Sequence, residues 1–300
     1  MLISVFSVIL NVLAVGLIIT KSKKETSAYK TALLSSRVLL CAAQFQWGCL
    51  MCIVPLLPFP AFIFYGFFKY SVDVILLLQI WVLLIVSFLW SLFGTLVVRF
   101  RMVVRRKSFF DISVRKYWFV SVMSYLACII TVIYMLEILR KPSEITDAYI
   151  AYRYPKYSSV PKENSLLVFA DKKVMRFSIF SCIAISAGLI TCYICLSILI
   201  FLEVRNRVNS MSATVQKYHL KVLKDIIQQI IIKLITFILY PSLTCMLYFV
   251  TPEYDSIKIT MILYNIFVAA PIPGTIVLIV QTPSYRQFLV RALSKRAESS

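Results

Sequence analysis

Histidine is almost absent from this chain, which contains one, His219, in a polar segment. A membrane-embedded metal hydrolase needs several histidine ligands, and an intramembrane serine hydrolase needs a buried histidine, so both classes are excluded. Retinal-type Schiff-base chemistry needs a lysine deep in the last apolar run, but Lys258 lies at the outer end of that run. No nucleotide-binding motif occurs either. The sequence therefore predicts a protein that is not an enzyme and has no metal or cofactor.

Charge is also scarce. Only 15% of the 300 residues are charged and 60% are hydrophobic, whereas soluble proteins carry about 25% charged residues. This composition is typical of a protein that crosses the membrane several times. The apolar runs reach twenty residues or more, which predicts helices, because the strands of membrane barrels are shorter and alternate in polarity.

Cysteine is missing from the long polar segments. All eight cysteines lie within apolar runs, so we expect no disulfide between loops. Two pairs, Cys49 with Cys52 and Cys192 with Cys195, have the C-x-x-C spacing of metal or redox sites. In apolar helices the same spacing is more often found for small residues that pack between helices, and we favour that interpretation.

Seven apolar runs alternate with polar or basic segments. They predict an all-α seven-transmembrane bundle with spans at about residues 2–20, 31–57, 74–98, 117–136, 177–202, 226–250 and 257–281. The third run is the clearest, because its 25 residues form a helix of roughly 37 Å, enough to cross a bilayer core of roughly 30 Å. The first run follows Met1 without a charged segment or a cleavage site, which argues against a signal peptide.

Basic residues are distributed unequally between the two sides of these spans. The loops after spans one, three and five, together with the tail 282–300, hold twenty lysines and arginines, and the other side holds nine. Because basic loops stay in the cytoplasm, this bias predicts an outer N-terminus and a cytoplasmic C-terminus. The net charge of +19 is explained by topology and contact with anionic lipid, and not by nucleic acid.

Two segments outside the spans stand out. Residues 138–173 form a long polar loop on the outer side, rich in tyrosines that include Tyr152. The tail has apolar residues spaced as on one face of a helix, which predicts a short amphipathic helix on the inner leaflet, with a frayed basic tail as the alternative. The stripe consists of Tyr285, Phe288, Leu289, Ala292 and Leu293.

A few polar residues lie within or beside the spans. Arg37 and Lys233 lie about 10 Å from the cytoplasmic edge at 1.5 Å per residue, so we expect their side chains to snorkel to the surface or to pack at the inner mouth of the bundle. Gln79 and Trp81 lie in the outer half of span three and are candidates for ligand binding. Asp73, at the outer end of the same span, and Tyr152 in the long loop are further candidates.

Prolines interrupt the last two spans. Pro241 lies in span six, and Pro271 and Pro273 lie in span seven. Because proline removes a backbone hydrogen bond, adjacent interrupted spans predict a hinge that couples an outer cavity to the inner surface. Static kinks that only shape the packing are the alternative.

Several stretches resemble the nematode serpentine chemoreceptors, most closely their class H group. The proline-rich stretch PLLPFPAFIFYG follows span two, and VVRF ends span three, with Arg99 and Phe100 matching the family pattern. A glutamine-containing run precedes the proline of span six. The stretch PIPGTIVLIVQTPSYR ends span seven, with Gly274, Tyr285 and Arg286 matching, whereas Pro273 replaces the usual histidine.

This resemblance implies a G-protein-coupled chemosensory receptor in the plasma membrane of sensory cilia. Its ligand would be a small molecule or odorant bound in the outer half of the bundle. A heterotrimeric G protein would meet the basic inner loops, where the candidates are Arg99, Arg101, Arg105, Arg106 and Lys221. The family usually has a longer outer N-terminus, so a truncated receptor is an alternative. A ligand-gated cation channel of inverted topology and a seven-span transporter are the functional alternatives.

Overall fold

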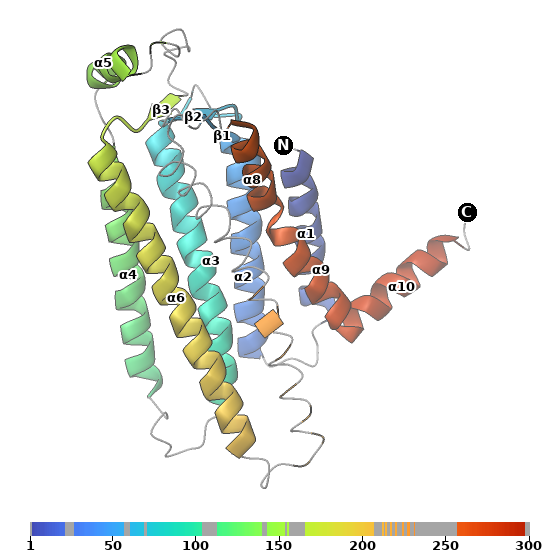
Figure 1. The fold of residues 1–300 in the computed structure, drawn as a ribbon. Helices are drawn as coiled ribbons and strands as arrows, with labels where there is room; N and C mark the ends of the chain where they lie inside the picture. Colours follow the sequence, from blue (N-terminus) through green and yellow to red (C-terminus); the bar gives the residue numbers. More distant parts are fainter. Residues whose placement is uncertain are drawn as a thin grey trace.

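The computed structural model is a bundle of long helices with a small β-sheet at one end (Figure 1). It describes residues 2–21, 27–56, 61–68, 71–103, 113–139, 143–153, 155, 166–206 and 257–297, with isolated positions from 212 to 231. Lys233, Pro241 and much of the predicted span 226–250 lie outside the described residues. Helix α1 begins at the end of the bundle that carries the sheet, hereafter the sheet end, and α9 ends toward the opposite end (Figure 1).

The first half of helix α1 (Leu2–Lys21) has its small and polar residues inside and large apolar residues outside, whereas Leu17 and Ile18 near its end are buried. Ser4, Ser7 and Asn11 recur at the spacing of one helix face and are buried, whereas Phe6 and Ile9 are more than half exposed. Helices pack closely in lipid through small residues, because lipid tails solvate large apolar side chains as well as a protein core does. This arrangement indicates a membrane helix and is the reverse of that in a soluble bundle.

The predicted span 31–57 is not a single helix. Helix α2 (Ser27–Phe45) continues into a π-helix, η1 (Gln46–Met51), and the helical conformation stops at Cys52, whose φ is 44°. The chain then enters strand β1 (Ile53–Pro55), because proline cannot donate the hydrogen bond that would extend a helix. The expected helix was therefore too long at its C-terminal end.

The sheet joins two segments that are far apart in the sequence. Strand β2 (Ala61–Phe64) pairs antiparallel with β1 on one side and with β3 (Leu166–Val168) on the other. The segment 138–173 is thus not a plain loop, since it contains β3 and helix α5 (Ser143–Arg153). Ile150 of α5 packs against Ala61 and Val168 of the sheet.

Helices α3 (Val74–Val103), α4 (Val114–Leu139) and α6 (Lys172–Asn206) form one side of the bundle (Figure 1). Polar side chains tie α3 to α4, since Trp90 Nε1 donates to Ser121 Oγ over 2.7 Å and the hydroxyls of Ser87 and Tyr125 lie 2.6 Å apart. Hydrogen bonds of this kind are the usual connections between helices in lipid, where the hydrophobic effect gives no attraction.

The predicted span 257–281 is divided into two helices. Helix α8 (Ile257–Ala269) ends beside Ala270, and α9 (Pro271–Gln281) begins at the proline. Because Pro271 has no N–H group, the carbonyl of Phe267 instead accepts from Ala270 N at 3.1 Å. Helix α10 (Pro283–Ala297) follows and projects away from the bundle (Figure 1).

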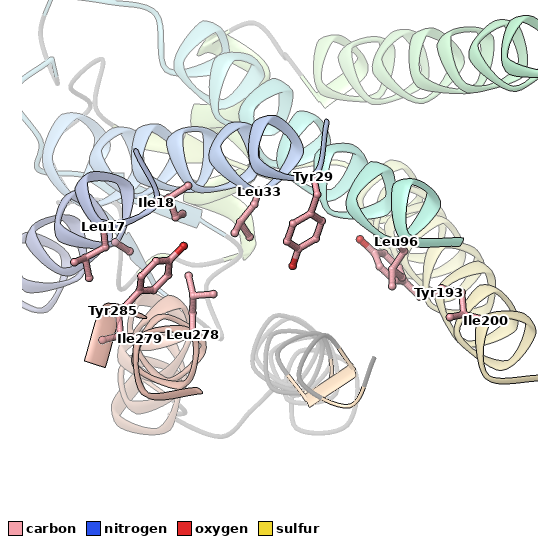
Figure 2. Close-up of a cluster of buried hydrophobic side chains, with 11 residues drawn as sticks. Leu17, Ile18, Tyr29, Leu33, Leu96, Tyr193, Ile200, Leu278, Ile279 and Tyr285 are labelled. Carbon is pink, nitrogen blue, oxygen red and sulfur yellow. The ribbon is translucent and has the colours of Figure 1, made fainter. Parts of the chain in front are cut away.

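Two apolar clusters fill the bundle. The cluster opposite the sheet end joins Leu17 and Ile18 of α1 to Leu278 of α9 and Tyr285 of α10. Figure 2 shows Tyr285 between α1 and α9, with Tyr29 and Leu33 of α2 across from it. The cluster at the sheet end contains Trp47 and lies beneath β1 and β2.

Within the described residues, four helices are long and apolar enough to cross a membrane. They are Leu2–Lys21, Val74–Val98, Arg115–Ile138 and Met261–Gln281, the last spanning the α8–α9 break. A shorter apolar helix, Thr191–Glu203, lies within α6. The chain is therefore a helical membrane protein.

Candidate functional site

Four aromatic rings from three helical elements meet at the sheet end of the bundle. Trp47 of η1 is the centre of this aromatic cluster, which also contains Trp81 of α3 and Tyr264 and Phe267 of α8. The ring centroid of Trp47 lies 4.2 Å from that of Trp81, 5.5 Å from that of Phe267 and 6.1 Å from that of Tyr264. Trp81 and Phe267 are also neighbours, at 6.3 Å. The separations that involve Phe267 and Tyr264 are those of favourable aromatic pairs, and the two tryptophan rings lie closer still.

The π-helix η1 gives Trp47 its position. Gln46 anchors this element to α3, because its Nε2 donates to the carbonyl of Leu77 over 3.4 Å. Gly48 allows α1 to lie directly against η1, since a Cβ at Gly48 would lie only 2.1 Å from the Cβ of Ser4. π-Helical turns are rare and often occur at functional sites. The position of the Trp47 ring is therefore fixed by two contacts of η1, the hydrogen bond from Gln46 to α3 and the close packing of Gly48 against α1.

Trp47 has an unsatisfied donor. Its side chain is 7% exposed, and its Nε1 is buried with no hydrogen-bond partner among the described residues. The amide oxygen of Gln44, three residues earlier, is likewise unpartnered within that part of the chain. By contrast, Trp90 has its Nε1 hydrogen-bonded to Ser121. Buried polar groups are nearly always paired, so the indole N–H of Trp47 requires an explanation.

The four ligand-binding candidates from the sequence lie in different places. Trp81 belongs to the aromatic cluster, and Gln79 donates from Nε2 to Oε1 of Glu137 on α4 over 2.7 Å. Asp73 caps α3, since its Oδ1 accepts from the backbone N–H of Ile75 at 3.0 Å. Tyr152 on α5 is 88% exposed. Of the four, only Trp81 is part of the cluster.

A second site lies in the interior, where three polar side chains from α1, α2 and α9 form a chain of hydrogen bonds. Nη1 of Arg37 donates to Oγ1 of Thr275 over 2.9 Å. The hydroxyl of Thr275 lies 3.0 Å from Oδ1 of Asn11 and 2.9 Å from the carbonyl of Pro271, two acceptors for its one hydrogen. Asn11 donates in turn to the carbonyl of Ser7.

The expectation that Arg37 snorkels to the cytoplasmic surface was wrong. Its side chain is 0% exposed and points into the bundle, and its Nε and Nη2 have no hydrogen-bond partner among the described residues. The length of the side chain permits snorkelling, but here Thr275 provides an acceptor deep in the interior. An intramembrane charge held in this way is a functional candidate.

Sequence reasoning missed Trp47, Asn11 and Thr275. Asn11 could have been found, because it is a lone amide in an apolar run and such residues usually face the bundle interior. Trp47 had a weaker signal, the flanking glutamines Gln44 and Gln46. Thr275 had none, because threonine is common in membrane helices and often bonds to its own backbone.

Of the five candidate G-protein contacts, only Arg101 has a described side chain. Arg101 is exposed in the last turn of α3, and Arg99 lies two residues earlier on the same helix. Arg105, Arg106 and Lys221 lie outside the described residues. Among the hinge candidates, Pro271 begins α9 and is buried, and Pro273 lies on the same helix and is exposed.

Comparison with known proteins assigns the family. No curated protein matches the chain. A family model described as serpentine type 7TM GPCR chemoreceptor Srh matches residues 1–295, which is nearly the whole sequence. This family consists of chemoreceptors and not of enzymes, in agreement with the seven apolar runs. The chain therefore belongs to the serpentine seven-transmembrane GPCR chemoreceptors of the Srh family.

Proposed function

We propose that this receptor binds an odorant or other small molecule at the sheet end of the bundle and activates a heterotrimeric G protein at the opposite end. The observation that carries the proposal is the aromatic cluster around Trp47, to which η1, α3 and α8 each contribute. Small-molecule sites are mostly apolar and aromatic with few polar groups, and they often lie between helices. The cluster has this composition.

The proposal also assigns roles to the other candidate residues. Trp81 contacts the ligand directly, because its ring already packs against that of Trp47. Gln79, two residues away, marks the boundary of the site through its hydrogen bond to Glu137. Asp73 and Tyr152 lie at or near the surface and would contact a ligand only as it approaches.

In the proposed topology the sheet end is extracellular and α10 lies on the inner leaflet. The lysine and arginine bias supports this orientation, as does the position of α10 beyond α9, away from the sheet end (Figure 1). The receptor would then reside in the plasma membrane of sensory cilia, with its basic inner loops facing the cytoplasm. Epitope tags test the topology: an N-terminal tag should be labelled on intact cells, and a C-terminal tag only after permeabilisation. The reverse pattern would support the ligand-gated channel alternative.

Coupling is tested by nucleotide exchange on purified Gα subunits with receptor reconstituted in lipid. We expect exchange to rise with an activating compound and to fall when Arg99, Arg101, Arg105 and Arg106 are replaced together by glutamine. The matched control replaces Arg153 of α5, an exposed arginine at the sheet end. The absence of exchange on every Gα class, with a compound that binds, would refute the coupling proposal.

A further inference from the structure

The aromatic cluster contains one buried donor without a partner, and this donor restricts the chemistry of a ligand. The indole N–H of Trp47 finds no acceptor among the described residues, although the side chain is almost completely buried. An unmet buried donor destabilises a protein, and an apolar replacement or a suitable partner would remove the penalty. A ligand that brings an acceptor to this atom would gain more affinity than one that adds only apolar contact.

The surroundings of this donor are apolar. The residues buried with Trp47 in its cluster carry no charge and include Met51, Leu77, Leu78 and Val268. Glu137 and Asp73 are a partner of Gln79 and the cap of α3, and neither belongs to this cluster. A charged ligand would lose its hydration without finding a counter-charge next to Trp47.

The donor is also held in place. Rings on two elements pack against the indole, and η1 is fixed to α3 through Gln46. A group that is already ordered loses little further entropy when a ligand binds, so its hydrogen bond contributes to selectivity. Trp81 and Tyr264 are only half-buried, so these are the rings of the cluster that a ligand would reach first.

We propose that the indole N–H of Trp47 is the hydrogen-bond donor to the ligand, and that favoured ligands are uncharged apolar molecules with one exposed acceptor oxygen, such as ketones and esters. This inference rests on the proposed ligand site and adds the ligand class. Alkenes and hydrocarbons of the same shape would fit the aromatic surroundings and leave the donor unpaired.

The test compares ligand pairs that differ only in the acceptor. Methyl ketones and their methylidene analogues have nearly the same shape, and acetophenone with α-methylstyrene is one such pair. Full-length receptor is expressed in cells with a calcium readout, and the same compounds are tested for thermal stabilisation of the purified receptor. We expect the ketone of an active pair to be about tenfold more potent, which is the effect of one hydrogen bond.

Two variants assign the preference to an atom. Trp47→Phe keeps a ring and removes the N–H, and we expect it to bring the ketone and its analogue to equal potency. Trp90→Phe is the matched control, because the N–H of Trp90 is already bonded to Ser121, and it should retain the preference. Both variants are compared at equal surface expression.

Each outcome has a defined meaning. Equal potency of ketone and methylidene analogue in the unmodified receptor overturns the inference, even if Trp47→Phe does not fold. Retention of the preference in Trp47→Phe overturns it as well. In both cases, a receptor response to either compound of the pair would still support the proposed ligand site at the sheet end. A surface-expressed receptor that neither responds to nor is stabilised by any compound of the panel would instead contradict the proposed function.

Discussion

Arg37 on α2 and Thr275 on α9 are 238 positions apart in the sequence, and a buried hydrogen bond of 2.9 Å joins them. This contact connects the middle of the second helix to the half-span that begins at Pro271. The carbonyl of Pro271 lies 2.9 Å from the same threonine hydroxyl, so the contact lies beside the residue at which the helix is broken. The break between α8 and α9 is thus tied to a buried charge.

Removing the threonine hydroxyl should destabilise the receptor more than removing the charge. Thr275→Val keeps the shape but takes away the one acceptor that Arg37 has among the described side chains. We expect a loss of about 1–3 kcal/mol, seen as a lower Tm of the purified receptor. Arg37→Met replaces the charge by an apolar side chain and should be close to neutral, or stabilising.

The double variant tests whether the two effects share one cause. On the Arg37→Met background, Thr275→Val should have less effect, because no buried donor remains to be left unpaired. Thr191→Val is the control, since that residue is exposed and its hydroxyl donates to the carbonyl of Ala187 in its own helix. An equal loss from Thr275→Val on both backgrounds would contradict the assigned contact.

Arg37 also shows where sequence reasoning reached its limit. The apolar runs and the family motifs were sufficient to predict a helical membrane protein of this family, because hydrophobic length and proline position are local properties. Whether Arg37 snorkels or turns inward depends on an acceptor 238 residues away, which no local pattern records. The same is true of Trp47, whose neighbours come from α3 and α8.

The sheet was missed for a related reason. The segment after η1 was assigned to the end of a span, because its apolar residues continue the run with no charge to interrupt it. The strand pairing of β2 with β3 depends on residues more than a hundred positions later. Cys52 in the left-handed conformation ends the helical backbone, and this residue type gives no warning of such a turn.

The close approach of α1 to η1 gives a second prediction. A Cβ at Gly48 would lie 2.1 Å from both the Cβ and the Oγ of Ser4, so Gly48→Ala should lower the Tm and reduce surface expression. Adding Ser4→Gly removes both atoms and leaves the Cα of residue 4 at 3.6 Å, an ordinary contact. The double variant should therefore recover most of the loss.

Gly94 on α3 is the matched control for Gly48. A Cβ there meets nothing within 4 Å, so Gly94→Ala should be neutral or should stabilise by about 0.5–1 kcal/mol through the better helix propensity of alanine. If Gly48→Ala behaved like Gly94→Ala, the contact between α1 and η1 would be wrong.

The break between α8 and α9 gives a third prediction. Pro271→Ala restores an N–H that can donate to the carbonyl of Phe267 and make the two helices continuous. If the break is a hinge, the variant should be more stable by about 1 kcal/mol and give a smaller maximal calcium response to an activating compound. A higher half-maximal concentration would indicate weaker ligand binding, whereas the loss of a hinge lowers the maximal response.

Pro283 provides the control for Pro271. It is the first residue of α10, a position where proline is favoured, so Pro283→Ala should leave the maximal response unchanged. A Pro271→Ala receptor with higher Tm and full response would show that the break only shapes the packing.

Tyr285 and Phe288 on α10 distinguish a docked helix from a frayed tail. Tyr285 is 2% exposed and packs in the cluster with Leu17 and Leu278, whereas Phe288 is 39% exposed and has the Nζ of Lys21 4.2 Å from its ring centroid. Tyr285→Ala should lower stability by about 3 kcal/mol, because it leaves a cavity between α1 and α9. Phe288→Ala should cost under about 1 kcal/mol, since an exposed cation–π contact contributes little. Thermal unfolding of the two purified variants measures the difference, and equal, small effects would mean that α10 does not dock on the bundle.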